Sequence, residues 1–424
     1  MTATSDTINA SLLNSDTLIS VGSLEEPLST QHEKDKNGQM TMLQAVLVLT
    51  ITITGIGLLS VSYCFRSGVF LNLILTLILA SVSFVTFIYL IDSSVKSNIH
   101  DYSQLMSVAL SSKFVIVVNI ILAVLLFGVG ILYIQYTYSL TSAFLKNFKG
   151  IPNWVYNRWF LIFTPVLCIN FPLMCLKTMQ KLSFVSFASM ALVFVYFLHC
   201  AYYFGKSVKN DGFDPQKQMK YFNFSRIFLS AMGIQATSYT CHPNIFPTLV
   251  KLENGTKTRK TIVMACVVCL AYLIYTAPGL LGYFTLFDKI QDPVVITYYP
   301  SGQIFTSITT GLYALLTVFC VPLILFACRL SINDIIFKTE FTTLRWNLIA
   351  LVLLVLAAII AITVKKINSI FGIIGGVLCP LIAYILPAFY YIRICKPGIF
   401  KLLFAYFVIL FGFAIIVISL YNCF

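Results

Sequence analysis

The sequence predicts an all-α protein with about eleven transmembrane helices, and three observations lead to this fold class. First, 59% of the 424 residues are hydrophobic and only 10% are charged, whereas soluble proteins carry about 25% charged residues. Second, apolar runs of about 20 residues, the length that a helix needs to cross a bilayer, follow one another along the chain. Third, two of these runs, five spans apart, are interrupted by small and polar residues. The composition therefore excludes a soluble domain and indicates a polytopic membrane protein.

The apolar runs define the predicted spans in order. Residues 1–39 before them are polar and rich in serine and threonine, so we expect a disordered tail there and a transmembrane domain over 40–424. The predicted cores of the spans are 41–65, 69–91, 114–144, 159–176, 183–204, 226–250, 261–287, 303–327, 346–364, 370–392 and 399–421.

The positive charge of the chain fits membrane topology rather than nucleic-acid binding. The formal net charge is +13, and the basic residues lie in short loops between apolar runs, where they set the orientation of a membrane protein. With the N-terminus inside, 16 lysines and arginines lie on the inner side and 12 on the outer side. We therefore expect a cytoplasmic N-terminus and an extracytoplasmic C-terminus. Asn223, in an Asn-Phe-Ser sequence, is then a glycosylation candidate on the outer side.

The first span, 41–66, is poor material for a continuous helix at its centre. Its middle is the sequence Thr-Ile-Thr-Gly-Ile-Gly at 52–57, and each glycine costs a helix interior about 1 kcal/mol relative to alanine. A broken helix survives in a membrane only where protein or a water-filled cavity surrounds the break. The segment is therefore either a broken helix that faces an internal ligand site, or a continuous helix whose glycines serve close packing.

The sixth span contains the most polar interior of the chain, the sequence 231–244, which includes Pro243. A proline kink with hydroxyl groups bonded back to carbonyls one turn earlier would explain this pattern. We favour a second break that faces a ligand, because transporters built from two inverted halves open each half with an interrupted helix. This pattern predicts repeat one over 41–204, repeat two over 226–392, and an additional helix over 399–421.

Other polar groups inside the spans are few. No aspartate or glutamate lies well inside any span, which argues against a proton relay through a buried carboxylate and against a cationic substrate. His242 is either a proton carrier or a neutral structural group. Thr310 and Thr317, two turns apart in span eight, could ligate a cation or bond within their own helix. The twelve cysteines lie mostly in apolar runs, so we expect neither disulfides nor a metal site, and no cofactor.

Several short motifs occur in the same order as in one known family. They are GIGLLSVSY at 55–63, ATSYTCHP at 236–243, GYFTLF at 282–287, VP at 321–322, IFGIIG at 370–375 and ILP at 385–387. The chain therefore resembles the amino acid/auxin permeases, which include sodium-coupled neutral, proton-coupled and vacuolar amino acid transporters. The resemblance covers all eleven spans and leaves out only the N-terminal tail.

This resemblance implies a leucine-transporter-like fold of five plus five inverted spans with one extra helix. It also implies alternating access, with an amino acid bound between spans one and six. The residues expected at the substrate are Thr52, Thr54, Gly55, Ile56, Gly57, Leu58, Ala236, Thr237, Ser238 and Tyr239.

One departure from the family concerns the coupling ion. Sodium-coupled members carry an asparagine shortly before the glycines of the first helix and a threonine before the Val-Pro of the eighth. The matching positions here hold Ile51 and Cys320, although a shift of one turn in the matching would let Thr52 and Thr317 serve. We therefore expect transport that is driven by protons or by no ion, in preference to sodium.

Together with the span pattern, the resemblance leads us to expect a transporter of amino acids, neutral ones by preference, and not an enzyme. The alternative is an amino acid sensor or scaffold of the same fold that binds without substantial transport. We expect a monomer in the plasma membrane or a vacuolar or lysosomal membrane, whose partners are its amino acid substrate and lipid. The sequence alone leaves the choice of amino acid open.

Overall fold

The computed structural model describes residues 40–176, 184–211, 219–336 and 342–423. These residues are almost entirely helical, and their only extended pairing is an isolated bridge between Met40 and Leu252. The predicted tail over 1–39 lies outside them. The principal helices are α1 (Met42–Thr54), α2 (Val61–Cys64), α3 (Val69–Ser97), α4 (Leu105–Ala109), α5 (Val115–Leu145), α6 (Arg158–Pro165), α7 (Phe171–Cys175), α8 (Phe184–Asp211), α10 (Arg226–Ser238), α11 (Ile245–Leu249), α12 (Lys257–Leu286), α13 (Ile304–Ile336), α14 (Thr343–Thr363), α15 (Ile367–Ile373), α16 (Leu386–Tyr390) and α17 (Ile399–Cys423).

The helices follow the predicted spans in order, with one difference in number. Among the described residues, nine helices are long and apolar enough to cross a membrane, and the bent pair Met42–Thr54 and Gly57–Ser67 makes a tenth. The segment predicted as span six consists of two short helices, α10 and α11, neither of which is long enough alone. The difference from eleven therefore arises at the breaks, which cut a span into pieces.

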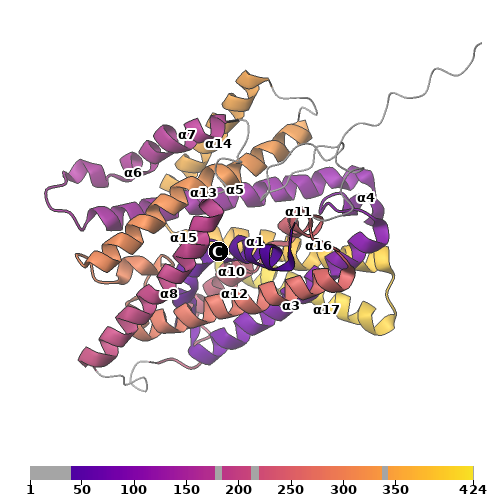
Figure 1. Cartoon of the computed structure of the whole chain (residues 1–424), viewed down its shortest axis with the longest axis horizontal. Helices are drawn as coiled ribbons and strands as arrows, with labels where there is room; N and C mark the ends of the chain where they lie inside the picture. Colours follow the sequence, from indigo (N-terminus) through magenta and orange to yellow (C-terminus); the bar gives the residue numbers. More distant parts are fainter. Residues whose placement is uncertain (1–39, 177–183, 212–218, 337–341, 424) are drawn as a thin grey trace, which may run out of the picture.

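Two long helices lie at the centre of the arrangement. Helices α5 and α13 pack along one another, with α6, α7 and α14 on one side of them (Figure 1). On the other side lie α3, α12 and α17, and α1, α10 and α11 lie between the two groups (Figure 1). Helix α12 contacts both α1 and α3, and α10 contacts both α15 and α17. The two interrupted segments are therefore enclosed by other helices, as a broken helix in a membrane requires.

The predicted span ten is wound unusually. Between α15 and α17 the chain contains three π-helical turns at Ile374–Leu378, Leu381–Ile385 and Tyr391–Cys395. Such wide turns are rare and occur often at functional sites, because each leaves a backbone group free. Tyr102, which is buried, donates its hydroxyl proton to the carbonyl of Ile382 at 2.6 Å.

The end of span one and the start of span six are joined through their main chains. We call the side of the molecule where α1 begins the near side, and the side where span one ends the far side. The amide of Val69 donates to the carbonyl of Lys220, and the amide of Asn223 donates to the carbonyl of Ser67, both at 2.8 Å. Gly68 has φ +107°, which L side chains rarely adopt, and a Cβ there would lie 2.5 Å from a carbonyl oxygen of the crossing segment.

Side chains reinforce this junction. The carboxylate of Asp288, just after α12, accepts from Lys220 Nζ at 2.7 Å and lies 3.7 Å from Arg66 Nε. The side-chain amide of Asn223 donates to the carbonyl of Arg66 at 3.1 Å. The predicted glycosylation candidate is therefore half-buried and already hydrogen-bonded in the folded chain, and its modification stays a prediction.

The far end of α14 is held by Gln135 and Arg158. The side-chain amide of Gln135 donates to the carbonyls of Ala361 and Val364, and Arg158 gives a prediction about stability. Arg158 donates to the carbonyl of Ala361 at 2.7 Å, and its guanidinium lies over the ring of Tyr138. Because hydrogen bonds to charged groups contribute about 1.5–3 kcal/mol, Arg158→Ala is expected to lower the melting temperature of the purified protein. Lys149→Ala removes an exposed charge from the preceding loop and serves as the control. Equal melting temperatures for the two variants would contradict this assignment.

Candidate functional site

The break in span one is centred on Gly55. Helix α1 ends at Thr54, Gly55 has φ +26° and ψ −146°, and a 3₁₀ turn begins at Ile56. The two helical pieces are bent by 48° relative to one another. A positive φ of this kind favours glycine, which explains why this residue type stands at the break. The structure therefore has the broken helix that the sequence predicts, not the continuous one.

The break in span six follows Ser238. Helix α10 ends there, and residues 239–241 are not helical before the turn His242–Asn244 leads into α11. The hydroxyls of Thr237 and Ser238 donate to the carbonyls of Gly233 and Ile234, each at 2.9 Å. Both interpretations of this sequence thus apply in part, since the helix is broken and its hydroxyls also bond back one turn.

The two breaks meet at Gly57 and Ser238. A Cβ atom on Gly57 would lie 2.1 Å from the Oγ and 2.9 Å from the Cβ of Ser238. No side chain can therefore occupy position 57 while these segments keep their present contact. The approach explains the second glycine of the Gly-Ile-Gly sequence by packing, whereas Gly55 is explained by its backbone conformation.

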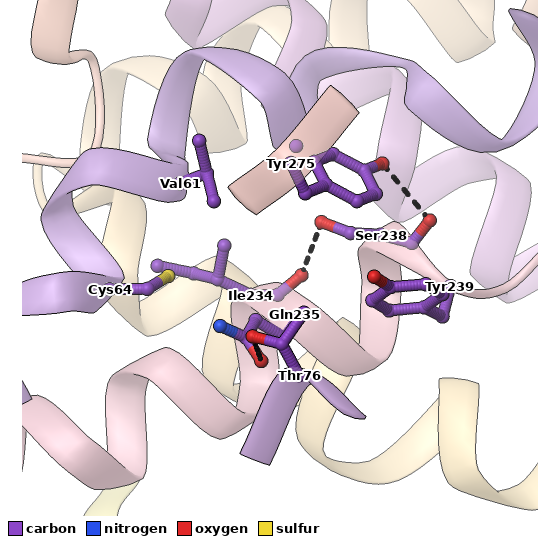
Figure 2. Close-up of a pocket in the computed structure, with 9 residues that line it drawn as sticks. Val61, Cys64, Thr76, Ile234, Gln235, Ser238, Tyr239 and Tyr275 are labelled. Atoms are coloured by element: carbon purple, nitrogen blue, oxygen red, sulfur yellow. Dashed lines mark hydrogen bonds between the residues drawn. The ribbon is translucent and has the colours of Figure 1, made fainter. Parts of the chain in front are cut away.

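Tyr275 of α12 joins the breaks from a third helix. Its hydroxyl lies 2.6 Å from the carbonyl oxygen of Ile53 and 3.2 Å from that of Thr54. It also lies 3.1 Å from the carbonyl oxygen of Ser238, and Figure 2 shows this contact. A tyrosine hydroxyl has one proton to donate, so the three carbonyls share a single donor. Backbone carbonyls from both broken helices therefore converge on one point.

A small cavity lies beside this point. Its volume is about 10 Å³, which is the room of a single water molecule. A free amino acid does not fit into such a space, so the structure shows the site closed. The lining comes from spans one, two, six and seven, and most of it is shown in Figure 2. The lining residues are Gly57, Val61, Cys64, Thr76, Ile234, Gln235, Ser238, Tyr239 and Tyr275.

One wall of the cavity is an amide network. The side-chain amide of Gln235 donates to Asn72 Oδ1 at 2.7 Å, and the hydroxyl of Thr76 donates to Gln235 Oε1 at 3.0 Å. All three residues are buried. Such a network is stable in a low-dielectric interior because most of its polar groups have partners. It ties α10 to α3 next to the break in span six.

The far side of the site is closed by hydroxyl contacts. The hydroxyls of Ser60 and Tyr136 are hydrogen-bonded, which joins span one to α5. The side-chain amide of Asn368 donates to the hydroxyl of Tyr63 at 3.0 Å, which joins span one to α15. These contacts therefore connect the broken helix of span one to α5 and α15.

The remaining residues predicted at the substrate divide into two groups. The hydroxyls of Thr52 and Thr54 bond back to carbonyls of α1 at 2.9 Å, and that of Thr54 is buried. The side chains of Leu58, Ala236 and Tyr239 are buried in the core. The structure thus brings residues 54–58 and 236–239 close together, while Thr52 lies two residues before Thr54 on α1. That these residues bind substrate stays a prediction.

The predicted coupling residues lie away from the cavity lining. His242 is buried, its Nε2 lies 2.8 Å from the hydroxyl of Thr86, and its ring stacks on Phe87. Thr317 is buried and accepts a hydrogen bond from Thr137 of α5 at 3.1 Å, and Thr310 is buried in the same helix. These partners suit structural roles, and whether any of the three residues couples to an ion stays untested.

Sequence reasoning missed three side chains of this region. Tyr275 and Gln235 line the cavity, and the hydroxyl of Tyr133 lies 3.4 Å from where a Cβ of Gly55 would stand. The available signal was a tyrosine or glutamine inside an apolar span, since such polar groups need a partner there. Only the fold shows which partners they find.

Comparisons with known proteins agree with this architecture. Residues 38–424 match the family described as transmembrane amino acid transporter protein. Sodium-coupled neutral amino acid transporter 4 of Pongo abelii is 29% identical over 194 residues, covering 44% of this chain and 35% of the relative. Putative sodium-coupled neutral amino acid transporter 10 of Xenopus laevis is 25% identical over 392 residues, covering 89% of this chain and 37% of the relative. The matches thus span little more than a third of each relative's length.

Solved structures of transporters share the fold. Mhp1, a nucleobase-cation-symport-1 family transporter in a closed conformation with bromovinylhydantoin bound, aligns with a TM-score of 0.61, 9% identity and 91% of both chains. MhsT in complex with L-phenylalanine aligns with a TM-score of 0.58 and 11% identity, covering 90% of this chain and 98% of MhsT. This likeness confirms the predicted leucine-transporter-like fold. The residue boundaries of the two repeats stay a prediction.

Proposed function

Because the chain belongs to the transmembrane amino acid transporter family, we propose that it carries free amino acids across the membrane by alternating access. The family is named for transport, in agreement with the prediction that the chain is not an enzyme. The observation that supports the proposed site is the convergence of three carbonyls, those of Ile53, Thr54 and Ser238, on one point between the breaks. An ammonium group has three protons and suits such a set of acceptors.

The two ends of an amino acid would use the two kinds of free backbone group. The ammonium would bind the carbonyls at the ends of α1 and α10, and the carboxylate would bind the free N–H groups around Gly55, where helical structure begins again. The side chain would lie toward Val61 and Ile234. No aspartate or glutamate of the described ranges lines the cavity, which supports a neutral substrate over a cationic one.

Two observations about the coupling ion point in opposite directions. The relatives are named as sodium-coupled, and this favours sodium over the proton that the sequence analysis preferred. Against sodium, Ile51 and Cys320 supply no hydroxyl or amide oxygen at the positions where sodium-coupled members carry them. We propose transport that does not require sodium, and direct measurement decides between these arguments.

The test is uptake of a panel of labelled neutral amino acids by proteoliposomes that contain the full chain. We expect uptake above that of empty liposomes, equal in sodium and choline buffers, and lost in Gly55→Leu and Ser238→Leu. Gly205→Ala is the matched control, because a Cβ at Gly205 meets nothing within 4 Å. Uptake that survives in both leucine variants would overturn the site. Uptake that needs sodium would overturn the ion proposal alone.

The same experiment separates the alternative function. A sensor or scaffold would bind an amino acid, seen as a rise in melting temperature, without carrying label into liposomes. We also propose the orientation predicted from the charged loops, with the N-terminus in the cytoplasm.

A further inference from the structure

We propose that the hydroxyl of Tyr275 takes the place of the substrate's ammonium group in the empty transporter, and so allows the empty site to close. This inference rests on the proposed function and concerns the step in which the carrier returns without cargo. The side chain of Tyr275 would then determine how fast the carrier performs net transport, which needs the empty site to close, relative to exchange, which does not.

The argument begins with the carbonyls at the breaks. In a continuous helix the carbonyls of Ile53 and Thr54 would accept from amides four residues later, and the break at Gly55 removes those partners. The carbonyl of Ser238 is left at the end of α10 in the same way. An unpaired carbonyl is costly where water is excluded, so closing an empty site requires another donor.

Tyr275 is the donor that the structure supplies. Its side chain is 2% exposed, and its hydroxyl lies within 3.2 Å of all three carbonyl oxygens. The ring packs edge-on against Tyr239, with centroids 5.4 Å apart, and this contact holds it at the break. Figure 2 shows the ring directed from α12 into the gap between the two broken helices.

The position of this hydroxyl makes it a competitor of the substrate. The adjoining cavity holds about one water molecule, so an ammonium group can reach the same carbonyls only if the hydroxyl withdraws or shares them. A substrate that brings three protons satisfies more acceptors than one hydroxyl does. The empty carrier can therefore close on Tyr275, and the loaded carrier closes on its substrate.

The test compares two modes of transport in Tyr275→Phe proteoliposomes. Net uptake into vesicles without internal substrate requires the empty carrier to close and return, whereas exchange with preloaded unlabelled substrate does not. We expect Tyr275→Phe to lower net uptake about tenfold while exchange stays within about twofold of the unmodified protein. The KM for exchange should fall, because the competing hydroxyl is gone.

The matched control is Tyr272→Phe, which removes a hydroxyl one turn earlier on α12 from a partly exposed ring outside the cavity lining. This variant should leave both modes unchanged. An equal loss of net uptake and exchange in Tyr275→Phe, or no loss in either, would overturn the inference. The absence of both modes in the unmodified protein would instead overturn the proposed function, and the inference with it.

Discussion

Gly57→Ala is expected to reduce uptake by about one to two orders of magnitude, although the variant folds. The added methyl group would lie 2.1 Å from Ser238 Oγ, so the two breaks could close only after one of them moves. Overpacking of this kind costs about 1–3 kcal/mol, which lowers the population of the closed state about 5- to 150-fold. The measurement is initial uptake in proteoliposomes, with the melting temperature as the check on folding.

Removing the side chain of Ser238 should restore the uptake that Gly57→Ala loses. In the double variant Gly57→Ala/Ser238→Gly, the two side-chain atoms of Ser238 that lie under 3.0 Å from the new methyl group are absent. The hydroxyl of Tyr275, 3.3 Å from that methyl group, and the carbonyl of residue 238 remain. Position 238 is the last residue of α10, where glycine costs no more than the roughly 1 kcal/mol that it costs in a helix interior. We therefore expect the double variant to recover most of the lost uptake, and Ser238→Gly alone to keep it. A double variant as inactive as Gly57→Ala would show that the contact is not the cause.

Gly375→Ala is expected to have the largest effect on folding. A Cβ at this position would lie 1.9 Å from the carbonyl oxygen of Gly233 and 2.2 Å from Thr237 Oγ1. The first of these atoms belongs to the backbone of α10, which cannot swing aside as a side chain can. The cost should therefore reach or exceed the upper end of the usual overpacking range, about 3 kcal/mol.

The measurement is the melting temperature of the purified protein and the yield of folded chain. Gly205→Ala is again the control, since the same substitution in the open part of α8 should be neutral or slightly stabilising. If Gly375→Ala had the same melting temperature as the Gly205→Ala control, spans six and ten would not pack through these main chains.

The fold was largely predictable because its main signal is local. Each apolar run carries its own evidence for a span, and the glycines at 55 and 57 carry the evidence for a break. The predicted span six lies in the structure as two helices, α10 and α11, each too short to span a membrane alone. The meeting of residues 54–58 with 236–239 followed from the expected symmetry of the two halves.

The details of the site were not predictable, because they depend on helices distant in the sequence. Nothing near Tyr275 indicates that its hydroxyl meets carbonyls more than 200 residues earlier in the chain. The fold gives Thr317 the neighbour Thr137 of α5, which nothing in the sequence around Thr317 indicates. Polar groups inside spans can be recognised from the sequence as needing partners, but their partners are set by packing.

The junction between residues 67–69 and the segment before α10 has a consequence for the opening of the site. Two main-chain hydrogen bonds of 2.8 Å and the carboxylate of Asp288 hold the far-side ends of spans one, six and seven together. In the proposed transport cycle we therefore expect these three ends to tilt outward together. Access from that side would then require the side-chain hydrogen bonds Ser60–Tyr136 and Tyr63–Asn368 to part.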